Sequence, residues 1–139
     1  ALITGYSRNY ASVIKPMLEL IGTAKGVTRV AASNLMLTKR GPMFLADTTI
    51  NINPTAKHLA KISQLTASLA KMFGIKPNIA MLSYSNFGAS HSENSTKIAE
   101  AINYIHRYFP GVVVDGELQA DFALNPGYEK TSSYFAIRL

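Results

Sequence analysis

The chain has 139 residues, of which 47% are hydrophobic and only 16% charged, so it is long enough for one domain with a buried core. The absence of cysteine excludes disulfide bonds, thiolate nucleophiles and cysteine-ligated zinc. The net charge of +6 favours anionic partners, but the basic residues are scattered and no nucleic-acid-binding motif occurs, so we expect no nucleic-acid partner.

The first residues predict a strand rather than a targeting signal. Residues 1–4 (ALIT) are apolar and end at Gly5, without the basic region and long apolar stretch of a signal peptide. No apolar run approaches the ~20 residues that a membrane helix requires. We therefore expect a cytoplasmic protein without a membrane partner, and a first strand that continues from a segment upstream.

A helix is predicted over residues 11–21, because apolar side chains recur along one face. Pro16 lies inside this pattern and predicts that the helix starts near Lys15 or is kinked there. Gly22 predicts the end of the helix.

Two strands and a long helix are predicted next. Residues 28–38 and 43–49 have strand patterns, and the Lys-Arg-Gly-Pro turn at 39–42 predicts that they form a hairpin. The helix that follows is expected to be capped by Asn53 and ended by Gly74.

The second half of the chain alternates strands and helices. Residues 78–84 form a nearly continuous apolar run, typical of a strand covered on both faces. We predict a helix over 92–109, a strand over 112–114 and a helix over 117–124. Strands separated by such helices indicate crossover connections. We therefore expect an α/β fold, with three αβα layers and a mostly parallel or mixed sheet.

The loop after residues 78–84 is the first candidate site, because ligands of open α/β sheets bind beyond the carboxyl ends of strands. A helix N-terminus follows the loop and suits phosphate, and a glycine in it allows a positive φ angle or close backbone approach. The candidate residues are Ser83, Tyr84, Ser85, Asn86 and Gly88. Ser and Asn are also ordinary capping and turn residues, so both readings stay open. Neither a P-loop nor a dinucleotide-binding fingerprint is present.

An acidic segment is the second candidate site. Glu117 and Asp121 are four residues apart and would share a helix face, where carboxylates can perform acid–base chemistry or hold a divalent cation. Alternatively, Asp115 caps the helix and Glu117 favours its first turn. We prefer the second interpretation for Glu117, whereas a ligand-facing role stays open for Asp115 and Asp121.

The third candidate is Arg8, which could bind phosphate through its forked guanidinium or be an ordinary surface arginine. No two of the three histidines have metal-ligand spacing, and no serine–histidine–acid arrangement with a nucleophile elbow is present, so we expect neither a metal site nor hydrolase chemistry. The histidines are His58, His91 and His106.

Three sequence blocks together resemble the phosphate acetyltransferase and butyryltransferase family. They are GPMFLADTTININP at 41–54, MLSYSNFG at 81–88 and VDGELQADFAL at 114–124, in the family's order and spacing. The resemblance covers roughly residues 1–125 and implies the second of two α/β lobes around a cleft, as a fragment of a larger domain. Residues 126–139 depart from the family pattern, and we treat them as a divergent or incomplete segment.

The details of two blocks resemble one branch of this family, the C-terminal phosphotransacetylase-like domain of bacterial NADP-dependent malic enzymes. They are the Ser-Tyr-Ser-Asn-Phe-Gly stretch at 83–88 and the Asp-Gly-Glu-Leu-Gln stretch at 115–119. That branch implies a regulatory domain that binds acetyl-CoA without transferase activity. NADP and a divalent cation are then expected only in a malic-enzyme portion, and none in this chain.

Two alternatives stay open beside the regulatory domain. One is an active phosphate acetyltransferase that uses acetyl phosphate and CoA, and the other is an oligomerisation lobe without a ligand. The resemblance also implies self-association as a dimer or higher oligomer, which would explain the low charge. Polarity supplied by Ser, Thr and Asn is an equally simple explanation.

The resemblance also implies which residues face the cleft. Lys15 stands where catalytic relatives often have an arginine before proline, and lysine cannot reproduce a bidentate fork. The cleft-facing candidates are Tyr6, Ser7, Arg8, Lys15, Ser83, Tyr84, Ser85, Asn86, Gly88, Asp115, Gln119 and Asp121.

Overall fold

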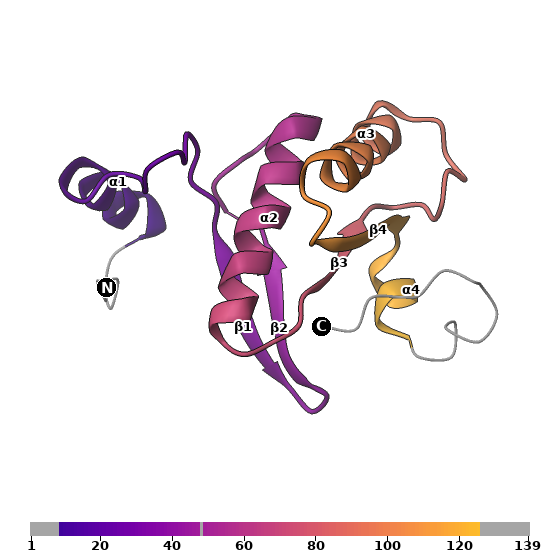
Figure 1. Cartoon of the computed structure of the whole chain (residues 1–139), viewed down its shortest axis with the longest axis horizontal. Helices are drawn as coiled ribbons and strands as arrows, with labels where there is room; N and C mark the ends of the chain where they lie inside the picture. The colour runs from indigo at the N-terminus through magenta and orange to yellow at the C-terminus, as the bar shows by residue number, and fades with distance from the viewer. Residues whose placement is uncertain (1–8, 48, 126–139) are drawn as a thin grey trace. The chain divides into compact units, whose positions relative to one another are not determined.

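The computed structural model describes residues 9–47 and 49–125 (Figure 1). The chain divides into two compact units, Ala1–Val30 and Ala31–Leu139, and each is described by itself. The predicted strand at 1–4, three candidate residues and the segment after residue 125 lie outside the described residues. The three candidates are Tyr6, Ser7 and Arg8.

The described part of the first unit contains helix α1, Tyr10–Leu20. The Asn9 side chain caps it by accepting a hydrogen bond from the Ser12 N–H at 2.9 Å. The helix continues through Pro16, so the expectation that it starts near Lys15 is wrong. The proline leaves the Ser12 carbonyl without its helical donor, but Ser12 is exposed and water can satisfy that carbonyl.

The predicted hairpin is confirmed. Strands β1 (Ser33–Thr38) and β2 (Gly41–Ala46) pair antiparallel, with Thr38 opposite Gly41. The turn is therefore only residues 39–40, and the glycine and proline that were expected in it belong to β2. The Thr38 hydroxyl closes the turn by donating to the Gly41 carbonyl at 2.8 Å.

Helix α2 (Ala56–Met72) is present, but it begins later than expected. Its cap is Thr55 rather than Asn53. Thr55 and His58 form a reciprocal capping box, in which each side chain accepts from the other residue's backbone N–H at 3.4 Å. This arrangement satisfies two backbone donors at once, the second of them through the His58 side chain. Gly74 ends the helix with a φ angle of +73°, as predicted.

The second half forms a parallel strand pair joined by a helix. Strand β3 (Asn78–Leu82) leads through a loop into α3 (Glu93–Tyr108), and β4 (Val113–Leu118) then pairs parallel to β3. A short helix, α4 (Ala120–Leu124), follows. The predicted helix over 117–124 is wrong at its start, because pairing with β3 extends β4 through residues 117 and 118 and outweighs their helix propensity.

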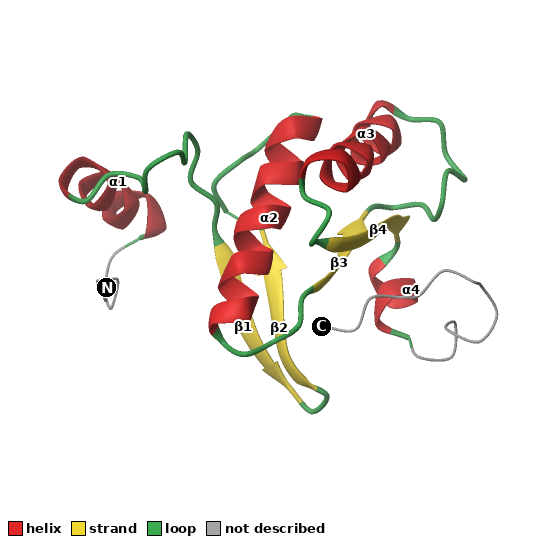
Figure 2. Ribbon diagram, in the orientation of Figure 1, coloured by secondary structure: helices red, strands yellow, loops and turns green. Residues whose placement is uncertain are grey.

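The strands form two small sheets (Figure 2), β1 with β2 and β3 with β4. The α/β class, the mixture of parallel and antiparallel pairing and the crossover helix are confirmed, while a single continuous sheet is not seen among the described strands. Helix α2 packs against α3 and both sheets, and α4 contacts β3.

The core lies between α2, α3 and the β3–β4 pair. Its most deeply buried members are Ala60, Ala101 and Ile105, each with no exposed surface. The face of α3 that joins this core carries Ile98, Ala101, Ile102 and Ile105. In the described part of the chain, no helix is long and apolar enough to cross a membrane.

Candidate functional site

The loop after β3 and the end of β4 form one site. Because the two strands are parallel neighbours, their carboxyl ends lie side by side, and the first two candidate segments meet there. The Ser83 N–H donates to the Leu118 carbonyl at 2.8 Å, and the Phe87 N–H donates to the Glu117 carbonyl at 2.8 Å. These bonds fix the loop backbone on the end of β4.

Gln119 holds the loop through three hydrogen bonds. Its backbone N–H donates to Asn86 Oδ1 at 2.7 Å, and its Oε1 accepts from Asn86 Nδ2 at 2.9 Å. Its Nε2 donates to the Tyr84 carbonyl at 2.7 Å. Because its backbone N–H and its side-chain amide both bind the loop, Gln119 has a structural role: it sets the shape of the loop.

Glu117 is a residue of this site that the sequence interpretation placed elsewhere. It lies on β4 rather than in the first turn of a helix, and only 4% of its surface is exposed. Its Oε1 accepts a hydrogen bond from the Ser85 hydroxyl at 2.5 Å. The Asp-Gly-Glu sequence has the pattern of a turn followed by a helix start, so no local signal marks this glutamate as buried.

The other two acidic candidates, Asp115 and Asp121, do not form a cluster with Glu117. Asp115 accepts a hydrogen bond from the Gly116 N–H at 2.8 Å and caps no helix, and Asp121 is exposed on α4. Glu117 and Asp121 therefore do not share a helix face. Among the residues that the structure describes, no group of three or more His, Asp or Glu side chains is placed to hold a metal ion.

Gly116 brings β4 very close to β3. Its φ angle is +142°, and a Cβ atom added there would lie 2.7 Å from the Met81 carbonyl oxygen and 2.9 Å from Met81 Cβ. Only glycine accommodates both the backbone angle and this approach. The close contact sets the spacing of the two strand ends that carry the site.

Tyr84 is an exposed side chain of the loop, with 58% of its surface accessible. Its hydroxyl hydrogen-bonds the Ser90 hydroxyl at 2.6 Å. Hydrogen bonds from Ser90 and Ser92 lower the pKa of the Tyr84 phenol below its ordinary value. Further along the loop, Gly88 has a φ angle of +77°, which confirms the positive φ expected for it.

The start of α3 is already occupied by the chain's own groups. Ser92 Oγ accepts from the Ser95 N–H at 3.1 Å, and Ser95 Oγ accepts from the Ser92 N–H at 2.9 Å. Glu93 places a negative charge in the first turn. These groups compete with an anion for the helix N-terminus, so phosphate binding there requires more than the free N–H groups that the sequence predicted.

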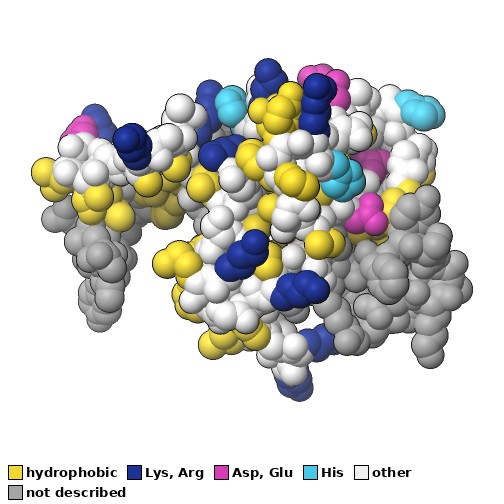
Figure 3. All heavy atoms as spheres, in the orientation of Figure 1, with side chains coloured by type: hydrophobic (Ala, Val, Ile, Leu, Met, Phe, Trp, Pro, Cys, Tyr) yellow, Lys and Arg dark blue, Asp and Glu magenta, His cyan; other side chains and the backbone are white. Residues whose placement is uncertain are grey.

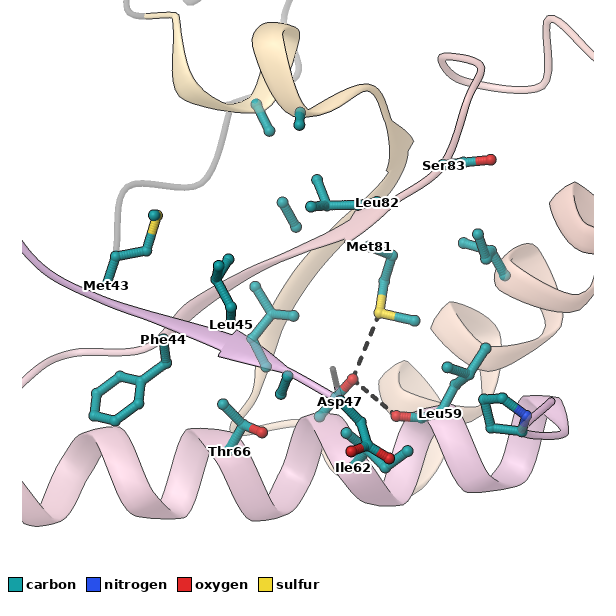
Figure 4. Close-up of a pocket in the computed structure, with 18 of the residues that line it drawn as sticks. Met43, Phe44, Leu45, Asp47, Leu59, Ile62, Thr66, Met81, Leu82 and Ser83 are labelled. Carbon is teal, nitrogen blue, oxygen red and sulfur yellow. Dashed lines mark hydrogen bonds between the residues drawn. The ribbon is translucent and has the colours of Figure 1, made fainter. Parts of the chain in front are cut away.

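An apolar groove of about 690 Å³ borders the loop (Figure 4). Residues of β2, β3, α2, α3 and α4 contribute to its lining. The main apolar lining residues are Met43, Phe44, Leu45, Leu59, Ile62, Met81, Leu82, Ala123 and Leu124, and the polar or charged lining residues include Asp47, Ser83, Tyr84, Asn94 and Lys97. Lys97 Nζ is bound to Asn53 Oδ1 at 2.8 Å, which ties the start of α3 to the segment before α2.

Asp47 organises the segment that links β2 to α2. Its Oδ1 accepts from the backbone N–H groups of Ala32 at 3.1 Å and Ile50 at 3.4 Å. Its Oδ2 accepts from the Asn51 backbone N–H at 3.1 Å and from the Asn51 side-chain amide. Asp47 belongs to the 41–54 sequence block, and its role there is structural because it holds the backbone of this segment in place.

Lys15 lies exposed on α1, in the other unit. His58 belongs to the α2 cap, while His91 and His106 are exposed. On the face shown in Figure 3, the Lys and Arg side chains are distributed over several elements and do not merge into one continuous patch.

Comparison with known proteins agrees with the predicted resemblance. The sequence profile described as phosphate acetyl/butaryl transferase matches residues 1–134. The chain is 37% identical to the NADP-dependent malic enzyme of Haemophilus influenzae over 130 residues, which is 94% of this chain and 17% of that protein. It is 35% identical to the phosphate acetyltransferase of Bacillus subtilis over 125 residues, covering 90% of this chain and 39% of that protein.

A solved structure supports the same relationship. The EutD phosphotransacetylase from Staphylococcus aureus superposes with a TM-score of 0.71 at 32% identity, over 86% of this chain and 38% of that one. The chain therefore spans at most 39% of the length of each of these relatives. The match of the profile to nearly the whole sequence shows that the chain belongs to the phosphate acetyl/butaryl transferase family.

Proposed function

We propose that this chain is a regulatory domain of an NADP-dependent malic enzyme and that it binds acetyl-CoA. The observation that carries the proposal is its 37% identity to the Haemophilus influenzae NADP-dependent malic enzyme over 94% of the chain. The Asp-Gly-Glu-Leu-Gln sequence at 115–119, which resembles that branch, adds support.

The loop site has features that suit such a ligand. It lies at the carboxyl ends of two parallel strands, where α/β domains bind ligands. The net charge of +6 attracts an anionic molecule such as CoA. The groove beside Ser83 and Tyr84 offers mostly apolar surface to the uncharged part of the ligand.

The cofactors of a malic enzyme are assigned outside this chain. The sequence has no dinucleotide-binding fingerprint, and the described residues bring no metal-ligand cluster together. We therefore place NADP and a divalent cation in a malic-enzyme portion of the protein. That this domain binds its ligand without performing chemistry is part of the proposal.

Regulation requires that acetyl-CoA affinity be coupled to the distant active site, and such coupling is reciprocal. Calorimetry on the intact protein, with and without malate and NADP, measures it directly. We expect the acetyl-CoA dissociation constant to change when malate and NADP are present. An identical dissociation constant under both conditions would contradict the regulatory role.

A catalytic phosphate acetyltransferase is the second candidate function, favoured by the 35% identity to the Bacillus subtilis enzyme and by the likeness to EutD. In that reaction the CoA thiolate attacks acetyl phosphate, the acetyl group moves to sulfur and phosphate leaves. Positioning of the two substrates and stabilisation of the developing charge would be required. Robust acetyl-CoA formation from acetyl phosphate and CoA by the intact protein would favour this function over the regulatory one.

Self-association is part of the proposal. Strand β1 carries exposed apolar side chains, with Leu35 and Met36 each 43% exposed and Leu37 83% exposed. Leu35 and Leu37 share one face of the strand. Exposed apolar side chains of this kind favour contact with another chain. Light scattering should show a dimer or higher oligomer. An oligomer that never binds acetyl-CoA would instead support a purely structural lobe.

A further inference from the structure

Within residues 9–47 and 49–125, Glu117 is the one charged residue that is almost completely buried, with 4% of its surface exposed. Its Oε1 atom accepts from the Ser85 hydroxyl at 2.5 Å, and its Oε2 atom is buried without a hydrogen-bond partner among those residues. Burying a carboxylate is costly unless hydrogen bonds compensate. The bond to Ser85 is therefore the contact that holds this side chain in place.

Glu117 is also the centre of a continuous set of bonds under the loop. Its backbone carbonyl accepts from the Phe87 N–H at 2.8 Å, so one residue holds the loop at two points. Gln119, two positions along, holds the intervening Asn86. The hydrogen bonds with Glu117 and Gln119 therefore determine the shape of the loop.

The two sides of the loop differ in access. Tyr84 has 58% of its surface exposed, whereas Glu117 lies beneath the loop and is absent from the lining of the apolar groove. A ligand that binds on the exposed side of the loop would therefore not contact Glu117. Glu117 would affect binding only through Ser85 and the loop backbone.

We propose that Glu117 is a positioning residue for the loop over residues 83–88, and that its bond to Ser85 sets the affinity of the loop for the acyl-CoA ligand. The identity of the ligand rests on the proposed function. The role in loop shape rests on the geometry alone, so the two parts can be tested separately.

Hydrogen exchange and acetyl-CoA calorimetry on the intact protein test the two parts. The variants are Glu117→Ala, Glu117→Gln, Ser85→Ala and the Glu117→Ala/Ser85→Ala double variant, with Glu100→Gln as control because Glu100 is exposed on α3. We expect Glu117→Ala and Ser85→Ala to accelerate exchange in residues 83–88 without changing α2 or α3.

The same two variants should weaken acetyl-CoA binding roughly tenfold or more, the loss typical of a hydrogen bond to a charged group. The double variant should bind no more weakly than Glu117→Ala, because both changes remove one contact. Glu117→Gln should lie between, since its amide oxygen still accepts from Ser85. Glu100→Gln should match the wild type.

Unchanged exchange at residues 83–88 in Ser85→Ala and Glu117→Ala would overturn the positioning role, and so would acceleration spread equally over α2 and α3. Unchanged acetyl-CoA affinity despite a loosened loop would overturn the link to the ligand. A wild-type protein that does not bind acetyl-CoA would refute the proposed function, while the exchange data would still decide the role of Glu117.

Discussion

The closest approach of β4 to β3 predicts a large cost for Gly116→Ala. The new Cβ would lie 2.7 Å from the Met81 carbonyl oxygen, 2.9 Å from Met81 Cβ and 3.3 Å from Met81 Cα. Two of these atoms are backbone, and Met81 is buried in the core, so rotating a flexible side chain cannot relieve the clash.

Two terms add to the cost. A non-glycine residue at a φ angle of +142° carries about 1–3 kcal/mol of backbone strain. Overpacking of a rigid contact adds about 1–3 kcal/mol. The sum of about 2–6 kcal/mol is a large share of the roughly 5–15 kcal/mol that stabilises a typical domain.

Urea unfolding followed by circular dichroism measures this loss. The matched control is Gly111→Ala, because a Cβ atom at Gly111 meets nothing within 4 Å and its φ angle lies outside the range that only glycine favours. We expect the control to stay within about 0.5 kcal/mol of the wild type. A Gly116→Ala variant as stable as this control would refute the packing argument.

Three further predictions follow from other contacts. Thr55→Ala removes the α2 cap and should lower the free energy of unfolding by about 1 kcal/mol, whereas Ser68→Ala on the exposed face of α2 should change it little. Asp47→Ala removes the carboxylate that accepts from the backbone N–H groups of Ala32, Ile50 and Asn51 and should cost about 2 kcal/mol or more by the same urea measurement. Because hydrogen bonding lowers the pKa of Tyr84, its phenol should ionise at a lower pH than an unperturbed tyrosine. Ser90→Ala should raise that pKa, which absorbance titration of tyrosinate would show. An unchanged Tyr84 titration in this variant would contradict the assignment.

The helices could be predicted because their signals are local. The apolar stripes of α2 and α3 recur at helical spacing, and Gly74 ends α2 as expected. The hairpin was also predictable from the turn sequence between its strands. Helix starts were less certain, because Asn53 and Thr55 are both good capping residues. The choice of Thr55 depends on its reciprocal bonds with the residue three positions later.

The loop over residues 83–88 was identified from its place after a strand, but its anchors were not. Asn86 and Gln119 are 33 positions apart in the sequence, and Ser85 and Glu117 are 32 apart. No local sequence pattern predicts hydrogen bonds between residues so far apart in the chain. They form because parallel pairing of β3 and β4 places the ends of both strands together.

Local composition and spacing were therefore enough to predict the α/β class, the two long helices and the position of the loop after β3, whereas the role of that loop in ligand binding stays a prediction. The conformation of residues 115–119 was not predictable in this way, because an Asp-Gly-Glu sequence suits a turn and a helix start as well as a strand end. Hydrogen bonding to β3 and burial against the loop resolved that ambiguity and placed Glu117 beneath Ser85. These interactions exist only after segments distant in the sequence have packed together.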